Sequence, residues 1–166
     1  QPVFGFDRVT LWLDHAEIRG LSDVLEPHCR KFVLTPELMP NNPVWKAELE
    51  IHQPTKKLFP ALASRLGTTC RCIVTYAELA WDVVCEDARQ AEDVEAWRLS
   101  HIHQLNGRQP VVLHQTIWYY GRRAKASAGK RGRVLAMYAD KPCKLRGVVH
   151  GEHCAHMELR ITGSDA

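Results

Sequence analysis

The chain has 166 residues, 45% of them hydrophobic and 25% charged, with a formal net charge of +3. This length and composition predict a single globular domain over 1–166 with a real hydrophobic core, and they exclude a mostly disordered chain. No run of about 18 apolar residues is present, and the start Gln1-Pro2-Val3 has no signal-peptide layout, so we expect a soluble protein with no membrane partner. The start without Met, together with an end just after a strand pattern, predicts a fragment of a longer protein.

In the first half of the chain, alternation of apolar and polar residues predicts a strand over 8–14 and another over 44–52. The second strand would place Glu48, Glu50 and His52 on one face. A short helix is expected over 20–31, and the prolines and asparagines of 35–43 indicate a loop. A second helix is expected to open at Pro54 and to stop at Gly67, because Leu58, Leu62 and Leu66 recur at helical spacing.

The second half contains the longest strand pattern, over 70–84. It would place Tyr76, Glu78, Ala80 and Asp82 on one face and Ala77, Leu79, Trp81 and Val83 on the other. A solvent-facing helix is predicted over 87–105. Strands are then expected over 111–120, 134–140 and 154–162, the first two joined as a long hairpin whose tip, 121–132, is rich in Gly, Ala and Lys.

Helices alternate with strands early in the chain, and consecutive strands follow at its end. This order predicts an α+β domain. We expect a largely antiparallel central sheet with helices packed on one face.

The positive charge is local. Between 122 and 146 there are nine Lys and Arg residues and one acid, Asp140. Most of them surround the hairpin tip, and such a concentration favours binding to nucleic-acid phosphates. The candidate DNA-binding residues of this stretch are Arg122, Arg123, Lys125, Lys130, Arg131 and Arg133.

The six cysteines show no C-x-x-C pair, and reduced thiols are expected in the absence of secretory features. A zinc site formed by Cys143, His150, His153 and Cys154 is an alternative, although structural zinc sites usually have two tight ligand pairs.

Three segments carry residues suited to phosphodiester chemistry: Tyr76-Ala77-Glu78-Leu79-Ala80-Trp81-Asp82, Tyr138-Ala139-Asp140-Lys141 and His156-Met157-Glu158-Leu159-Arg160. A tyrosine can attack a phosphate and keep the bond energy in a covalent phosphotyrosine. Carboxylates can hold a divalent metal that stabilises charge on the phosphate, and hard oxygen ligands suit Mg²⁺ or Mn²⁺.

In this order, and with Tyr119-Tyr120-Gly121-Arg122-Arg123 between the first and the second, these segments resemble the replication initiation factor family and the filamentous-phage gene II type of rolling-circle initiators, relatives of the HUH endonucleases. The resemblance extends from Phe6 to the end of the chain. It implies a Rep-like nicking domain that cuts and rejoins single-stranded or melted origin DNA. It also implies a phage or plasmid initiator in the cytoplasm of a bacterial host, with a host helicase as a possible partner.

By this resemblance, Tyr138 matches the nucleophile and Lys141 the nearby basic residue that binds the phosphate or assists the leaving oxygen. Glu78, Asp82 and Glu158 match the carboxylates expected to bind Mn²⁺ or Mg²⁺.

The sequence departs from the family pattern at two positions. Tyr76 and His156 stand where the family often has Arg. Because His156 shares a strand face with Glu158, its imidazole is a further candidate metal ligand, with a hydrogen-bonding role as the alternative.

Three other functions remain open from the sequence. A conjugative relaxase would use the same chemistry. A non-catalytic nucleic-acid-binding module would use the basic hairpin and exposed aromatics without a metal. A zinc-stabilised interaction domain would depend on the late Cys and His residues.

Overall fold

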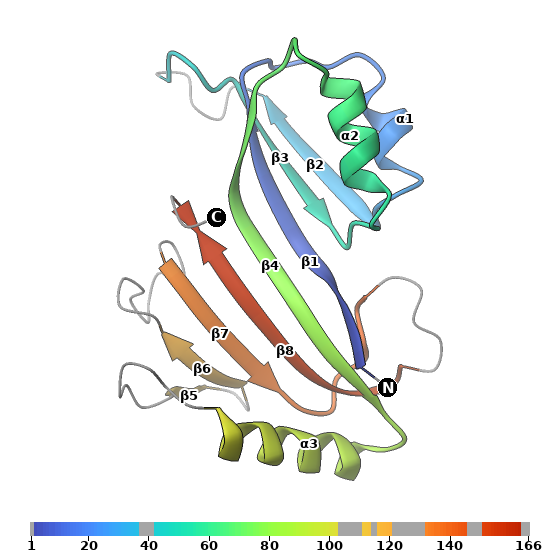
Figure 1. Ribbon diagram of the computed structural model, residues 1–166, viewed down its shortest axis with the longest axis vertical. Coiled ribbons are helices and arrows are strands. Elements are labelled where there is room, and N and C mark those ends of the chain that lie inside the picture. Colours follow the sequence, from blue (N-terminus) through green and yellow to red (C-terminus); the bar gives the residue numbers. More distant parts are fainter. Residues whose placement is uncertain are drawn as a thin grey trace.

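The computed structural model describes residues 2–36, 42–102, 111–113, 116–120, 132–145 and 151–163. Its centre is one eight-stranded sheet with the order β2-β3-β1-β4-β8-β7-β6-β5 (Figure 1). Every neighbouring pair is antiparallel. The strands are β1 (Pro2–Leu13), β2 (Lys31–Pro36), β3 (Ala47–His52), β4 (Cys72–Cys85), β5 (Val111–Leu113), β6 (Thr116–Tyr120), β7 (Gly132–Tyr138) and β8 (His153–Thr162). The fold is therefore α+β with an antiparallel sheet.

Three helices accompany the sheet: α1 (Leu21–Leu25), α2 (Leu58–Leu66) and α3 (Ala88–His101). In Figure 1, α1 and α2 lie at one end of the long strands β1 and β4, and α3 lies at the other end. Beneath α1 and α2 is the main hydrophobic core, in which Leu13, Leu49 and Ile51 are fully buried. A smaller cluster joins Ala91 of α3 to Ala155 of β8.

All three helices pack on the same face of the sheet. The register shows this. Val9, beneath α1 and α2, pairs with Ala77 of β4, and Ala155, beneath α3, pairs with Val83 of β4. Ala77 and Val83 are an even number of residues apart, so they lie on one face of the strand. The opposite face, which we call the polar face, carries the acids predicted from the β4 pattern. The expected one-sided packing of the helices is confirmed for the part of the chain that the structure describes.

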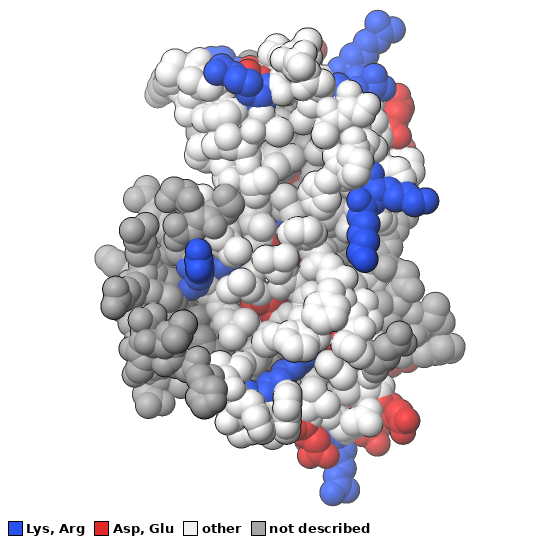
Figure 2. All heavy atoms as spheres, viewed as in Figure 1, with Lys and Arg blue, Asp and Glu red and all other residues white. Residues whose placement is uncertain are grey.

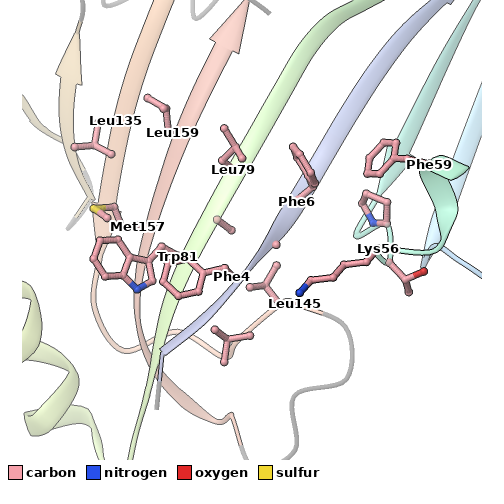
Figure 3. A pocket seen from close by; sticks show the side chains of 15 residues that line it. Phe4, Phe6, Lys56, Phe59, Leu79, Trp81, Leu135, Leu145, Met157 and Leu159 are labelled. Atoms are coloured by element: carbon pink, nitrogen blue, oxygen red, sulfur yellow. The ribbon is translucent and has the colours of Figure 1, made fainter.

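Between the two groups of helices, the helix-bearing face is open. A groove of about 690 Å³ lies there, and Figure 3 shows Phe4, Phe6, Trp81 and Met157 among the side chains that line it. The rings of Phe4 and Trp81 stack at 5.3 Å, and Phe4 is 63% exposed. Most of the visible surface around this hollow belongs to neither basic nor acidic residues (Figure 2). The groove is therefore apolar, whereas the opposite face of the same strands is charged.

Several expected boundaries in the first half were wrong. The helix expected over 20–31 covers only Leu21–Leu25, because Pro27 lacks the backbone donor that would continue it, and the chain then forms β2. The helix expected to open at Pro54 begins at Leu58. The backbone N–H of Thr55 donates instead to the carbonyl of His28, at 2.7 Å.

In the second half, the single strand expected over 111–120 is two antiparallel strands, β5 and β6. No Gly, Pro or Asn occurs between 111 and 120, so the sequence carries no turn signal there. The expected hairpin of β6 with β7 is confirmed, and its tip lies outside the described residues. The helix expected over 87–105 corresponds to α3.

Among the described residues, no helix has both the length and the apolar character needed to span a bilayer.

The packing predicts a contrast between two leucines on the helix-bearing face. Leu49 is fully buried under α1 and α2, whereas Leu79 is 39% exposed in the groove. Leu49→Ala should lower the free energy of unfolding by about 2–5 kcal/mol, and Leu79→Ala by about 1 kcal/mol. Urea unfolding followed by circular dichroism measures both. Equal losses would show that the core is not concentrated beneath these helices.

Candidate active site

A ladder of alternating charges crosses the polar face through four neighbouring strands, β3, β1, β4 and β8. It runs from His52 and Glu50 on β3, through Arg8 on β1 and Glu78 on β4, to Arg160, Glu158 and His156 on β8, and ends at Asp82 on β4. The register creates it, because β4 pairs Glu78 with Arg160 and Asp82 with His156. A side chain from one strand is thereby placed beside an opposite charge from the next.

The carboxylates at the centre of the ladder are buried and paired. Glu78 is 3% exposed and Glu158 is 1% exposed. Nε of Arg160 donates to Glu158 Oε1 at 2.6 Å and lies 3.3 Å from Glu78 Oε1, while Arg8 donates to Glu78 Oε1 at 2.8 Å. Tyr76 adds a short hydroxyl hydrogen bond to the same Glu78 oxygen. Because buried carboxylates are costly without such partners, these contacts offset the cost of burying both acids and hold them in place.

His156 joins two acids at the other end of the ladder. Its Nδ1 lies 2.5 Å from Asp82 Oδ1, and its Nε2 lies 3.0 Å from Glu158 Oε2. Burial would lower the pKa of the imidazole, but the hydrogen bonds to both carboxylates outweigh it and raise that pKa to about 9. His156 is therefore a cation at neutral pH, and both of its ring nitrogens face carboxylates.

Asp7 brings a third carboxylate to Glu78 and Glu158. Oxygen atoms of these three acids all lie within 4.8 Å of one another. Asp7 reaches them because β1 has a bulge between Phe6 and Arg8, where the strict alternation of faces is interrupted. Three hard oxygen donors at this spacing are a suitable set for Mg²⁺ or Mn²⁺.

The backbone around Asp7 is held by Gln53. Its N–H donates to the Asp7 carbonyl at 2.8 Å, and its side-chain amide donates to Asp7 Oδ1 at 3.3 Å. Gln53 has φ of 48°, a left-handed conformation that is unfavourable for a residue with a side chain. The protein therefore accepts local strain where Asp7 is positioned, a pattern found at functional sites.

Tyr138 is the last residue of β7 and lies beside this acidic centre. Its ring stacks on the His156 ring, with centroids 4.5 Å apart, and Nζ of Lys141 lies 4.3 Å from the Tyr138 ring centroid. Asp140, between the two residues, has φ of 51°. This left-handed turn directs the chain back so that Lys141 lies over Tyr138.

The pKa of the Tyr138 hydroxyl lies well above its usual value of about 10. Burial is the largest cause, followed by the negative charges of Glu158 and Asp7. A phenolate at this position is thus unfavourable while those carboxylates carry no bound cation. Positive charge placed on the acids would lower the pKa and favour the nucleophilic form.

The structure divides the predicted metal ligands into two groups. Glu78 and Glu158 lie together with Asp7, whereas Asp82 is turned toward His156 and also accepts a hydrogen bond from Cys143 Sγ at 2.9 Å. His156 connects the groups through its contact with Glu158.

The candidate DNA-binding residues fall mostly outside the described residues. This applies to Arg122, Arg123, Lys125, Lys130 and Arg131. The sixth, Arg133, lies on β7 with its side chain exposed. Lys141 is also exposed.

Of the zinc set considered from the sequence, the structure brings Cys143 and Cys154 together but directs His153 elsewhere. His153 forms an exposed pair with Asp140 at 2.6 Å, and β8 turns its side chain to the face opposite Cys154. His150 lies outside the described residues. None of the six cysteines is paired in a disulfide, and their reduced state stays a prediction.

Asp7, Arg8 and Arg160 belong to the site but were not selected from the sequence. The alternating pattern of the expected strand begins at Arg8. Asp7 lies before it, at a bulge where residues do not alternate between the two faces, so the pattern could not identify it. Arg160 shares the face of His156 and Glu158 by simple alternation, so strand periodicity was a signal that could have identified it.

The sequence matches no model of a known protein family. A search of curated proteins likewise finds no significant match.

The ladder predicts that Arg160 matters more to stability than an arginine in an exposed pair. Arg160→Met would leave Glu78 and Glu158 with one buried cation fewer, and should lower the free energy of unfolding by about 3 kcal/mol. The matched control is Arg71→Met, because Arg71 pairs with Asp14 at 2.9 Å but its side chain is 72% exposed. That control should cost less than about 1 kcal/mol. Chemical unfolding at neutral pH compares the two, and equal costs would contradict the proposed importance of the buried ladder.

Proposed function

We propose that this chain is the DNA-nicking domain of a rolling-circle replication initiator. It would cut single-stranded or melted origin DNA by metal-dependent attack of Tyr138. The observation that carries the proposal is that Tyr138 lies beside the carboxylates of Asp7 and Glu158, which cluster with Glu78, while Lys141 lies over the Tyr138 ring. A nucleophile, a cation and a divalent-metal ligand set are the three parts that this chemistry needs.

The proposed reaction is a transesterification that needs no other reactant. The Tyr138 oxygen forms a bond to the scissile phosphorus, and the bond from that phosphorus to one deoxyribose oxygen breaks. The phenol proton leaves Tyr138, and the departing sugar oxygen takes up a proton to become a hydroxyl. The phosphotyrosine retains the energy of the broken bond, so attack by a sugar hydroxyl in the reverse direction rejoins the strand.

The acids would bind the metal and lower the cost of forming the phenolate. A bound Mg²⁺ or Mn²⁺ supplies positive charge to the phosphate oxygens. Asp7, Glu78 and Glu158 would hold it, and hydrogen bonds from Arg8 to Glu78 and from Arg160 to Glu158 orient two of these carboxylates. The high pKa of free Tyr138 fits this dependence, because its main electrostatic cause is the charge that the metal would neutralise.

Lys141 and the basic hairpin would hold the DNA backbone. Lys141 lies over the Tyr138 ring, where its ammonium group can contact a phosphate that approaches the tyrosine or the oxygen that leaves. The basic residues of 122–133 precede β7, the strand that carries Tyr138, and would extend the positive surface along the bound strand.

The assignment to a Rep-like nicking domain related to the HUH endonucleases is also part of the proposal. The antiparallel sheet with all described helices on one face supports it, because the polar face remains for the site. A conjugative relaxase would use the same residues and differ in its biological context, in the cytoplasm of the same kind of bacterial host.

A non-catalytic nucleic-acid-binding module is the second candidate. The stacked and exposed Phe4 and Trp81 favour it, since aromatic rings are platforms for unpaired bases. These rings lie on the face opposite Tyr138, so variants of each face separate the two functions.

Tyr138→Phe should abolish covalent attachment to a single-stranded oligonucleotide that carries the origin, because it removes the attacking oxygen. Binding should change less than about threefold, since the ring and its stacking on His156 remain. Denaturing gel electrophoresis measures the adduct, and fluorescence anisotropy measures binding.

Tyr119→Phe and Tyr120→Phe are the matched controls, and both should form the adduct at the normal rate. An adduct that persists in Tyr138→Phe and disappears in either control would assign the nucleophile to the hairpin instead.

Adduct formation should stop when EDTA is added and return with Mn²⁺. Glu158→Gln should need at least about tenfold more Mn²⁺ for half-maximal rate, because it removes one charged ligand from the acidic centre. Glu92→Gln, an exposed position on α3, is the control and should leave the Mn²⁺ requirement unchanged.

Salt-sensitive DNA binding that EDTA does not alter, with no cleavage of any single strand, would favour the non-catalytic module. Adduct formation at the full rate in EDTA would contradict the metal dependence.

A further inference from the structure

A second group of possible metal ligands lies next to the acidic centre and is chemically different from it. Asp82 of β4, Cys154 of β8 and Cys143, which follows β7, place a carboxylate oxygen and two sulfurs within 4.8 Å of one another. Asp82 and Cys154 are fully buried, and Cys143 is half-buried. Two sulfurs and one oxygen form a softer donor set than the three carboxylates of Asp7, Glu78 and Glu158.

We propose that Cys143, Cys154 and Asp82 form a zinc site, with a water molecule in the fourth position. The proposal is independent of the nicking reaction. Zinc accepts thiolate and carboxylate ligands in a tetrahedral arrangement, and its usual bond lengths place neighbouring ligand atoms about 3.3–3.8 Å apart. The present group needs only small side-chain shifts to reach that spacing.

The charges balance when zinc binds. Without metal, the Asp82 carboxyl group lies between the Cys143 thiol and the His156 ring. On binding, Zn²⁺ enters and the two thiol protons leave, so the net charge of this buried group is unchanged. A buried site tolerates such an exchange far better than the gain of an uncompensated charge.

The two oxygens of Asp82 have separate partners. Oδ1 contacts His156 Nδ1 at 2.5 Å, whereas Oδ2 accepts the hydrogen bond from Cys143 Sγ at 2.9 Å. Oδ2 is therefore the oxygen that would bind zinc, in place of the thiol proton that it now accepts. The close contact of His156 with Oδ1 positions the carboxylate, as groups behind a metal ligand commonly do.

The site would fasten the segment 139–145 to the polar face. The backbone already holds this segment, since the N–H of Lys141 donates to the Cys154 carbonyl at 3.3 Å and that of Cys143 donates to the Gly151 carbonyl at 2.7 Å. Leu145 then packs at Gly5 of β1. Figure 1 shows the chain after β7 emerging beyond β1 near the N-terminus. Zinc bound to Cys143 would add a cross-link two residues from Lys141.

The test is titration of the reduced, metal-free protein with Co²⁺ as a spectroscopic substitute for zinc, followed by competition with Zn²⁺. We expect one thiolate-bound Co²⁺ per chain, identified by a near-ultraviolet charge-transfer band, and its displacement by one equivalent of Zn²⁺. Cys143→Ser should reduce the band per bound cobalt by about half and weaken Zn²⁺ binding at least about tenfold. Cys72→Ser, at an exposed cysteine of β4, is the matched control and should bind like the wild type.

Cys143→Ser is preferred to a change at the fully buried Cys154 because it is less disruptive to folding. No thiolate band in the wild-type protein would overturn the proposal, and so would equal spectra for Cys143→Ser and Cys72→Ser. A Cys143–Cys154 disulfide that persists under reducing conditions would overturn it as well. Metal held by Asp7, Glu78 and Glu158 gives no thiolate band, so this result does not depend on whether the protein nicks DNA.

Discussion

The buried ladder of alternating charges is the constraint on which the rest of the structure depends. Glu78, Glu158 and Asp82 are almost completely removed from solvent, and each lies against Arg8, Arg160 or His156. Carboxylates in such surroundings remain ionised only where cations meet them at hydrogen-bond distance. A shift of one residue in the register of β8 against β4 would turn Arg160, Glu158 and His156 away from the face that carries Glu78 and Asp82, so the ladder requires the observed register.

The same arrangement separates the functions of the two sheet faces. Helices and the hydrophobic core occupy one face, whereas Tyr138, the acids Asp7, Glu78 and Glu158, and the group of Asp82, Cys143 and Cys154 lie on the other. Two left-handed residues border this site, with Gln53 holding Asp7 and Asp140 turning Lys141 over Tyr138. Strain at both positions is consistent with selection for the geometry of the site. In both proposals together, the carboxylates of Asp7, Glu78 and Glu158 serve the nicking reaction. The neighbouring thiols of Cys143 and Cys154 fasten the segment that carries Lys141.

Strand periodicity was the most informative sequence signal. It correctly placed Glu78 and Asp82 on one face of β4 and His156 with Glu158 on one face of β8, because side chains alternate wherever the ladder is regular. It could not include Asp7, since a bulge interrupts that alternation, and it could not reveal which acids would meet. That depends on the order of strands, which places β8 between β4 and β7. For the same reason the proximity of Asp82 to Cys143 was not visible in the sequence, where 61 positions separate them.

The central claim is that the hydroxyl oxygen of Tyr138 forms the covalent bond to the DNA phosphate. The most direct measurement is mass spectrometry of the protein after reaction with an origin oligonucleotide and Mn²⁺, followed by nuclease trimming and peptide mapping. The account predicts one nucleotide remnant on the peptide that contains Tyr138, located at that residue by fragmentation. A remnant on Tyr119, on Tyr120 or on any other side chain would contradict it.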